Sequence, residues 1–422
     1  MKRKISRIAV WAMLSWTSLS FGFAQGRLQQ DGETQYKRSS LYSLLLAHPD
    51  AKYSKQIDYV YLSLPPADKY EDHNMNVRRI SAPGTKQVAP DAITRFCEVN
   101  HVARRLVAKW FDRDADGNFD LNLIARRGNY NASEMDVQQA RMSKRGLSLL
   151  SDAGEQLIGN TFVIVNDIVY VDKEKQAKTA SLILSIIGAA ANAASAASGS
   201  SEGAAVGDGL ASLAFLGAVI ADNLGGFTVK VRTHLLQLDW NDSIADTFYS
   251  DYWVDKNTPE EERAARRRMF DQSPLFGLRY IGYYDVKSEK TVLKGVNTPE
   301  DVITKVCARG LDKAIVGLQQ KYEAFKVKTP VMEVRDGKVI AKIGMKEGLT
   351  AATKFEVLQQ VEKDGKTVYR RVGTVAPEKK LIWDNRFMAA EEQAAGSELT
   401  ATTFKTLTGG PFYPGMLIRQ LK

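Results

Sequence analysis

The turn Asp112–Asp120 carries acidic residues spaced as in the first half of a calcium-binding loop. Its first, third and fifth residues are aspartates, the later two being Asp114 and Asp116, and Gly117 stands at the sixth position. Carboxylates at that spacing converge on one cation, and glycine permits the sharp turn between them. Leu123 occupies the twelfth position, where such loops carry a bidentate glutamate. Two interpretations stay open: a Ca²⁺ site, and an ordinary turn built from Asp, Gly and Asn.

A second acidic group could serve a hydrolase. Asp239, Asp242 and Asp246 lie around Trp240 and Trp253 in the sequence. Glycoside hydrolysis needs two carboxyl groups on either side of the scissile bond, and ordinary-looking Asp or Glu residues can supply them. The alternative is a solvated acidic turn at the end of a strand. The sequence favours the turn, because no spacing rule connects these residues to each other.

No other catalytic or metal-binding motif is present. The sequence lacks an HExxH motif, a Walker-type phosphate loop and a GxSxG elbow. We therefore predict no catalytic, cofactor-binding or metal-binding residues, and an enzyme has no support from the sequence. Both cysteines lie in apolar, helical segments, which favours buried free thiols over the disulfide that an exported compartment permits. The sequence contains four histidines, His48, His73, His101 and His234, and two cysteines, Cys97 and Cys307.

The N-terminus has the features of a secretory signal peptide. Four basic residues precede an apolar run from Ile8 to Phe23, and the run ends among the small residues Gly22 and Ala24. This is the pattern that the export machinery and its peptidase require. We predict that residues 1–24 are removed, and that the mature protein is periplasmic or associated with the outer membrane. No cysteine lies near the cut, so lipid attachment there is excluded.

The charge distribution argues against nucleic acid as a partner. The formal net charge is +9, and the signal peptide carries four of those positive charges, which leaves +5 on the mature chain. The densest basic cluster, Arg263–Arg268, follows Glu260–Glu262. Acidic residues ahead of basic residues suit the dipole of a helix and pairing between successive turns. A solvated helix therefore explains the cluster better than a phosphate-binding patch.

Hydrophobic periodicity predicts an N-terminal part with mixed elements. We predict an N-terminal helical segment over 25–54, with its helix in Tyr36–Pro49. A strand over Ile57–Leu64 follows, rich in β-branched and aromatic residues. Apolar residues recur at helical spacing over Asp91–Phe111. A further strand is predicted over Phe119–Ala125, and a polar helical stretch through residue 156.

The middle of the chain predicts a layered α/β core over residues 55–329. Thr161–Val171 is almost continuously apolar, as expected of a strand covered on both faces. Phe227–Trp240 alternates and predicts another strand, and Asp301–Phe325 has the apolar face of an amphipathic helix. Strands and helices that alternate in this way are typical of α/β layers.

Residues 330–422 predict a small all-β barrel domain. Short strands are expected at Val339–Ile343, Lys354–Leu358 and Val368–Val375, with turn residues between them. Lys363–Lys366 contains an Asp-Gly pair between alternating segments, which is a strong hairpin signal.

The segment 179–221 interrupts the predicted core. Between Lys178 and Glu202 lie 23 consecutive uncharged residues, dominated by Ala, Gly and Ser. Small residues let helices approach closely, as they do in membranes. A helical hairpin that contacts a membrane or a second subunit is one interpretation, and a helical insertion in a soluble protein is the favoured one. The second apolar arm is shorter than the roughly 20 residues that a spanning helix needs.

Two parts of the chain resemble known families. The order of ARRLVAKWF from Ala103, GNFDLNLIARRG, NTFVIVNDIVYV and FTVKVRTHLLQLD resembles the periplasmic α/β core of the curli secretion-channel family. Lys342–Leu349 (KIGMKEGL), Phe355–Val357 and Arg371–Val375 resemble the C-terminal β-barrel of flagellar assembly T-type proteins. The curli family has membrane strands where this chain has the Ala-rich segment 179–221. The resemblance carries over no functional residue.

These observations predict a non-catalytic structural, assembly or binding protein of the cell envelope. A homo-oligomer of the α/β core is compatible with this interpretation, and the C-terminal module is expected to bind protein partners. One alternative is a membrane-inserting oligomeric secretion or pore subunit that uses 179–221. The other is a cell-surface hydrolase with carboxylate catalysis.

Overall fold

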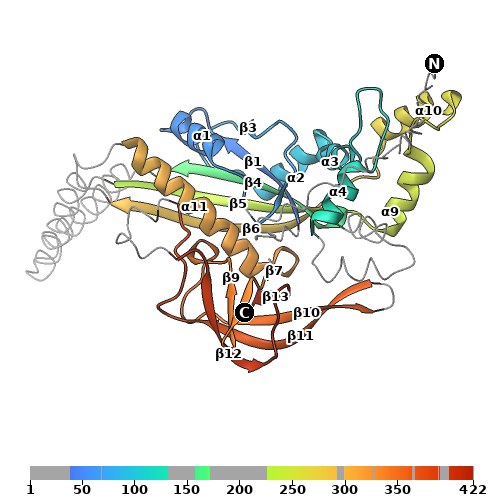
Figure 1. The fold of residues 1–422 in the computed structure, drawn as a ribbon. Helices are drawn as coiled ribbons and strands as arrows, with labels where there is room; N and C mark the ends of the chain where they lie inside the picture. Colours follow the sequence, from blue (N-terminus) through green and yellow to red (C-terminus); the bar gives the residue numbers. More distant parts are fainter. Residues whose placement is uncertain are drawn as a thin grey trace, which may run out of the picture. The chain divides into compact units, whose positions relative to one another are not determined.

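The chain folds into a mixed α/β sheet with helices, followed by a curled antiparallel half-barrel sheet (Figure 1). This confirms the predicted fold class. The computed structural model describes residues 39–67, 69–131, 157–171, 226–291, 299–326, 328–363, 366–387, 389 and 399–421. The predicted signal peptide and the segment 179–221 lie outside these residues. All described residues belong to one unit, 35–422.

The first sheet combines parallel and antiparallel strands. β1 pairs in parallel with β2, β3 and β4, whereas β5 pairs antiparallel with both β4 and β6. β6 is the last strand of the sheet, so one of its edges has no strand partner in the described chain. The strands are β1 (Ser40–Ala47), β2 (Glu71–Asp72), β3 (Arg79–Ser81), β4 (Thr161–Tyr170), β5 (Gly226–Leu238) and β6 (Leu278–Thr291).

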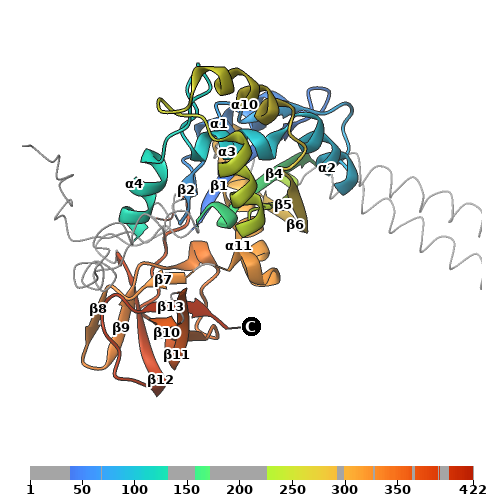
Figure 2. The ribbon, with the colours of Figure 1, turned by 90° about the vertical axis from the view of Figure 1, so that its right-hand side faces the viewer.

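Helices cover both faces of this sheet (Figures 1 and 2). α1 (Ser54–Ser63) and α11 (Pro299–Lys321) pack on one face, and α2 (Pro90–Val99) and α3 (Val102–Trp110) pack on the other. The central strands β1 and β4 are therefore buried on both sides, which explains their continuous apolar sequences. The remaining α-helices of the described core are α4 (Asn122–Asn131), α9 (Asp242–Thr247) and α10 (Glu260–Gln272).

The predicted helix over Tyr36–Pro49, and with it the helical segment 25–54, is wrong where the structure describes it. This stretch contains the strand β1. Leu44 packs with the core on the α2–α3 face, and Leu45 packs on the α1–α11 face. A short apolar run fits a buried helix and a buried strand equally well, because both are surrounded by other elements. Parallel pairing with β4 decides in favour of the strand.

The predicted strand over Ile57–Leu64 is also wrong, because these residues form most of α1. Ile57, Val60 and Tyr61 are buried, whereas Tyr59 is 75% exposed. Buried positions three and four residues apart lie on one face of a helix. The β-branched and aromatic composition that predicted a strand is thus the contact face of a helix, and packing against α11 overrides strand propensity.

The predicted strand over Phe119–Ala125 is the third error, since α4 begins at Asn122. Asp120 accepts a hydrogen bond from the backbone N–H of Asn122 at 2.9 Å, which ends the preceding turn.

The predicted helix over Asp91–Phe111 is correct in type but forms two helices, α2 and α3. The break lies at His101, whose φ of 49° is left-handed.

The longest predicted elements are confirmed. β4, β5 and α11 match the strands and the helix predicted from periodicity. α10 matches the predicted solvated helix, and Arg266 pairs with Glu262 one turn away at 3.1 Å. The strand β6 is absent from the predictions, because its polar and aromatic residues do not alternate cleanly.

The C-terminal sheet has the order β7-β13-β10-β11-β12-β9-β8. The predicted hairpin is confirmed by the register of β10 with β11, in which Lys363 pairs with Lys366. The core of this sheet includes Val357, Val375 and Phe404. The strands are β7 (Lys328–Pro330), β8 (Glu333–Arg335), β9 (Lys338–Ala341), β10 (Phe355–Lys363), β11 (Lys366–Pro377), β12 (Thr402–Gly409) and β13 (Leu417–Gln420).

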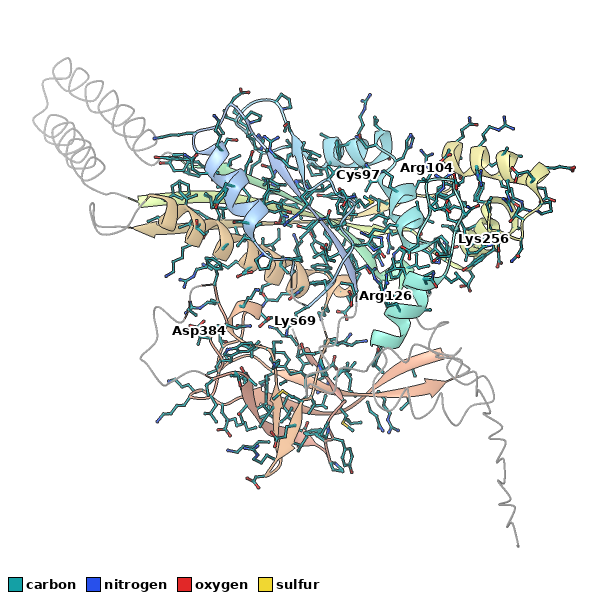
Figure 3. The ribbon with its side chains drawn as sticks, turned by 45° about the horizontal axis from the view of Figure 1, so that its top comes forward. Lys69, Cys97, Arg104, Arg126, Lys256 and Asp384 are labelled. Carbon is teal, nitrogen blue, oxygen red and sulfur yellow. The ribbon has the colours of Figure 1, made fainter. Side chains whose placement is uncertain are left out.

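Both cysteines lie in helices, as predicted, and both are free thiols. Cys97 is on α2 (Figure 3) and Cys307 is on α11, and each is buried. Burial raises the pKa of each thiol to about 12. Thiols with a raised pKa hold little thiolate near neutral pH, so they are poor nucleophiles.

A buried ion pair joins the end of β1 to β4. His48 Nε2 lies 2.8 Å from Asp167 Oδ1, and both side chains are almost fully buried. His48 Nδ1 contacts the carbonyl of Gly84 at 3.1 Å. Asp167 also accepts a hydrogen bond from the backbone N–H of Val88 at 2.6 Å. The pair therefore holds the loop before α2 against the sheet, and the hydrogen bond to Asp167 raises the pKa of His48.

Replacing His48 by glutamine should destabilise the protein more in acid than in base. Because the folded state raises the pKa of His48, the contribution of the pair is complete below the ordinary histidine pKa of 6.5. It is lost as the pH rises through the higher folded-state pKa. We expect His48→Gln to lower the free energy of unfolding by about 1–3 kcal/mol near pH 5.5 and by less near pH 8. Urea denaturation at both pH values measures this difference.

The matched control is His101→Asn, because His101 is exposed and Asn tolerates its left-handed backbone. This variant should change stability by the same small amount at both pH values. A loss for His48→Gln that is independent of pH would show that the side chain acts through packing alone.

Candidate binding site beside helix α11

A turn of the C-terminal module packs directly against α11. The turn is the 3₁₀ helix η4 (Met345–Glu347), which lies within the sequence KIGMKEGL. Gly348 follows it with a φ of 77°, and a Cβ there would lie 2.7 Å from Val316 Cγ1 of α11. Only glycine adopts this backbone without strain and allows so close an approach. The segment is therefore shaped by its contact with the core.

Glu347 holds the turn in place from within. Its Oε2 accepts hydrogen bonds from the backbone N–H of Gly344 at 2.7 Å and from Asn385 Nδ2 at 2.9 Å. Asn385 Oδ1 in turn accepts from the backbone N–H of Lys346 at 2.8 Å. Glu347 is only 8% exposed, so these charge-assisted bonds replace the water that its carboxylate loses. The turn is consequently a preorganised surface rather than a loose loop.

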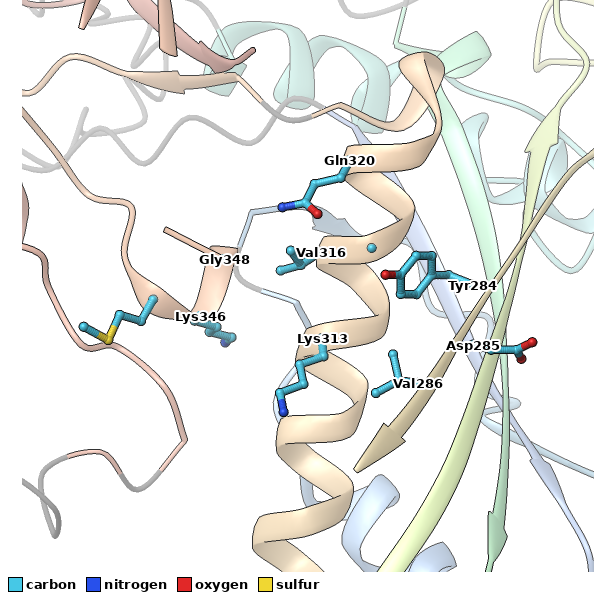
Figure 4. A pocket seen from close by; sticks show the side chains of 10 residues that line it. Tyr284, Asp285, Val286, Lys313, Val316, Gln320, Lys346 and Gly348 are labelled. Atoms are coloured by element: carbon cyan, nitrogen blue, oxygen red, sulfur yellow. The ribbon is translucent and has the colours of Figure 1, made fainter. Parts of the chain in front are cut away.

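A groove opens on one side of this contact, with a volume of about 310 Å³ (Figure 4). We call it the β6 groove, because the outer strand of the core sheet forms one wall. α11 forms the floor, and η4 with Gly348 forms the opposite wall. Its lining residues are Tyr284, Asp285 and Val286 of β6, Lys313, Val316, Gly317 and Gln320 of α11, and Met345, Lys346 and Gly348.

The floor of the β6 groove depends on a glycine in the middle of a helix. A Cβ at Gly317 would overlap the ring of Tyr284. Gly317 therefore lets that ring lie flat against α11, beside Val316. Glycine costs about 1 kcal/mol in a helix interior relative to alanine. The residue that permits this contact therefore lowers the intrinsic stability of the helix.

The charges of the β6 groove are unevenly distributed. In Figure 4 the side chain of Asp285 points away from α11. Its carboxylate accepts two hydrogen bonds from Arg232, at 2.7 and 3.0 Å, which raise the pKa of the guanidinium. Lys313 is exposed on α11 and forms no ion pair with any described residue. Lys346 lies 4.0 Å from Asp312. The groove therefore presents a net positive lining.

A second hollow lies on the other side of η4, with a volume of about 240 Å³. Its walls come from α1, β1, β4, α11 and the segments around Lys346 and Asn385. Tyr61 and Ser43 share a hydrogen bond of 2.5 Å, and Asn166 donates to Ser43 at 3.2 Å. Burial raises the pKa of Tyr61. These polar groups satisfy one another, so they stabilise the sheet–helix contact.

In the turn considered for calcium, Asn118 forms hydrogen bonds to one of the aspartates. Asp114 accepts hydrogen bonds from the backbone N–H and the side chain of Asn118, at 2.8 and 2.9 Å, and these hold the pKa of its carboxyl below the usual range. The side chain of Arg267 lies over Gly117 and donates to Asn118 Oδ1. Across the residues that the structure describes, no three His, Cys, Asp or Glu side chains converge on a metal position.

The turn has a structural role. Phe119 is buried against Phe248, Trp253 and Phe270, with ring centroids 5.1–5.9 Å apart. Arg113 pairs with Asp271 of α10 through two hydrogen bonds, at 2.7 and 3.1 Å. The turn thus fastens α10 to the core. Leu123, at the position of the missing ligand, is buried in α4.

The acidic group considered for a hydrolase does not form a cleft. Asp239, Asp242 and Asp246 are all exposed, after the end of β5 and on α9. None of them lines the β6 groove or the second hollow. Trp240 and Trp253 pack into the aromatic core around Phe248. The arrangement matches the solvated turn at a strand end that the sequence favoured.

Two further buried histidines are structural. His73 Nδ1 accepts from Arg127 at 2.8 Å, and burial lowers its pKa well below 6.5. Arg127 also stacks on the ring of Trp110, 4.5 Å from its centroid. His234 contacts the Tyr280 hydroxyl at 3.0 Å, and burial lowers its pKa to about 4. Neither histidine lines the β6 groove or the second hollow.

Sequence analysis missed the residues of the β6 groove. They come from separate segments, β6, α11 and η4, and none of them has a motif spacing. The one available signal was Gly317 inside an otherwise strong helix, since a glycine there indicates close packing.

Comparison with known proteins gives no family assignment: no protein-family model matches the chain, and no curated protein matches it. None of the described helices has both the length and the apolar character needed to cross a membrane.

Replacing Gly317 by alanine should disturb the groove, whereas the same change at Gly310 should not. At Gly317 the added methyl must displace the Tyr284 ring, so we expect a loss of about 1–3 kcal/mol in the free energy of unfolding. At Gly310 a Cβ would lie 3.1 Å from Ser288 Cβ and 3.1 Å from Val231 Cγ2, and the gain of up to about 1 kcal/mol in helix propensity offsets these tight contacts. Urea denaturation of both variants provides the measurement. Equal effects would contradict the close approach of Tyr284 to α11.

Proposed function

We propose that this protein is a non-catalytic protein of the cell envelope that binds another polypeptide through the β6 groove. The observation that carries the proposal is the construction of this groove. The core sheet supplies one wall, α11 supplies the floor, and η4 of the C-terminal module supplies the other wall. Binding sites are commonly concave and lie where separate structural units meet.

The lining of the groove supports binding rather than chemistry. Val316, Tyr284 and Met345 offer apolar contact area, while Lys313 and Gln320 offer polar contacts at the rim. A few polar groups around an apolar floor orient a bound chain without activating it. The buried histidines His48, His73 and His234 are engaged within the core, which supports a structural use of these titratable groups.

The predicted signal peptide supports a role in the envelope. A protein that leaves the cytoplasm meets partners in the periplasm or at the outer membrane, and the predicted C-terminal binding module would face them. The resemblance to curli-channel and flagellar T-type proteins, both of which are envelope assembly factors, points in the same direction. A homo-oligomer is compatible with the groove, because a second copy is also a polypeptide.

The alternatives have less support. A membrane-inserting pore subunit depends on the segment 179–221, which lies outside the described residues. A hydrolase depends on Asp239, Asp242 and Asp246, which are exposed and apart from both hollows. Neither alternative uses the β6 groove.

Photocrosslinking in cells tests the proposal. A photoreactive amino acid at Gln320 or at Met345 should form adducts of one discrete mass in the envelope fraction, and mass spectrometry should identify the same envelope protein in both. Charge reversal by Lys313→Glu should remove most of that adduct, because it changes the sign of the groove rim.

The control position is Lys405 on β12, which is exposed and outside the groove. The photoreactive residue at this position, and the reversal Lys405→Glu, should leave the adduct pattern of the groove unchanged. Adducts that form equally from Lys405, or a protein that stays in the cytoplasm, would contradict the proposed function.

A further inference from the structure

The backbone of β6 alternates between groups that face β5 and groups that face the β6 groove. In an antiparallel pair, every second residue directs its N–H and C=O toward the neighbouring strand, and the residues between direct theirs away. Tyr283 N–H and C=O both bond to the hydroxyl of Tyr322, at 3.0 Å each, so this residue faces away from β5. The register with β5 is regular from Tyr283 onward. Asp285 and Lys287 therefore also direct their backbone groups outward.

Tyr322 satisfies only the first of these outward positions. The hydroxyl sits over Gly282, whose φ of 152° and missing Cβ make room for the ring. The next two outward residues, Asp285 and Lys287, have no backbone hydrogen-bond partner among the described residues. The edge thus offers a short row of unpaired donors and acceptors at the mouth of the β6 groove.

The side chains of β6 leave this row accessible. Tyr284 and Val286 turn toward α11, and Asp285 turns to the other face, where it pairs with Arg232. Lys287 pairs with Glu289 at 3.3 Å. Charged side chains on an edge strand usually discourage pairing when they lie across the edge, but these are paired on the face of the sheet.

The charges of the floor and of the opposite wall of the groove select among extended chains. Lys313 is exposed and without an ion pair among the described residues, and in Figure 4 it points from α11 toward η4. Lys346 adds a second cation on the η4 side. A chain laid along β6 would direct every second side chain toward the face of the sheet that carries α11 and these lysines. Acidic side chains there gain complementary charge, and basic ones are repelled.

We propose that the β6 groove takes an extended, acidic segment of a partner protein, which adds as a further strand to the open edge of β6. Backbone hydrogen bonds to Asp285 and Lys287 supply register, apolar contact with Val316 and Met345 supplies affinity, and Lys313 supplies the preference for acidic side chains. This inference rests on the proposed function and specifies the chemistry of its partner.

Two synthetic peptides probe the groove of the purified, exported full chain. Each has about eight residues with serine at every second position; the residues between, which share one face of the strand, alternate valine with glutamate in one peptide and valine with lysine in the other. Fluorescence anisotropy should show binding of the acidic peptide, at least about tenfold tighter than the basic one at low salt. Amide hydrogen exchange of the segment around Asp285 and Lys287 should slow when the acidic peptide binds.

Three changes test strand addition itself. N-methylation of every second peptide amide removes the edge hydrogen bonds, and we expect about a tenfold loss of affinity, as for two lost bonds. Lys287→Pro removes one outward N–H and should therefore weaken binding. The fold should survive this change, because proline is tolerated at the edge of a sheet. Lys287→Ala keeps that N–H and removes only the side chain, so it should lose less affinity than Lys287→Pro. Lys313→Glu should reverse the preference between the two peptides.

The outcomes separate this inference from the proposed function. If crosslinks form in the groove but the methylated peptide and Lys287→Pro bind normally, strand addition is wrong and the binding function stands. If neither crosslinks nor peptide binding are found, both are wrong. If the chain self-associates and Lys287→Pro abolishes that association, the occupant is a second copy and the partner assignment is wrong. Unchanged thermal unfolding shows that each variant is folded.

Discussion

The packing of α11 across β5 and β6 is the contact on which the remaining structure depends. Val306, Ala314 and Leu318 of this helix are buried in the two hydrophobic clusters on its face of the sheet. Burial of the larger side chains, Val306 and Leu318, contributes about 1.5–3 kcal/mol each. The opposite side of α11 receives η4, so a single helix connects the core sheet to the C-terminal module. Both hollows lie beside it because neither module covers the helix completely.

Two glycines permit these close contacts. Gly317 admits the ring of Tyr284, and Gly348 brings η4 within reach of Val316. Glycine at each position lowers local stability, because it has more conformational freedom in the unfolded chain than any other residue. The compensation comes from tertiary contacts, including the hydrogen bonds of Glu347. A groove built in this way has rigid walls, which lowers the entropic cost of ordering a bound chain.

Two clusters of buried polar groups hold parts of the core together. His48 and Asp167 hold the loop before α2, and Arg127 spans Trp110 and His73. Such groups cost free energy when they leave water, and specific pairing offsets that cost. The groove, by contrast, keeps an exposed lysine and part of a sheet edge in solvent. The contrast between these paired groups and the incomplete edge of β6 makes the groove the strongest candidate for recognition.

The sequence by itself determined the elements whose pattern is long and local. β4, β5, α11 and the Asp-Gly hairpin follow from periodicity or turn chemistry within one segment, and the layered fold class follows from their order. Only the tertiary structure decided the short apolar segments, because β1 and α1 have compositions that suit either state and are assigned by their neighbours. It also decided the candidate site. Tyr283 and Tyr322 are 39 residues apart, and Glu347 and Asn385 are 38 apart, so no local pattern records these contacts. Side chains from distant segments meet only when the sheet, α11 and η4 have packed together.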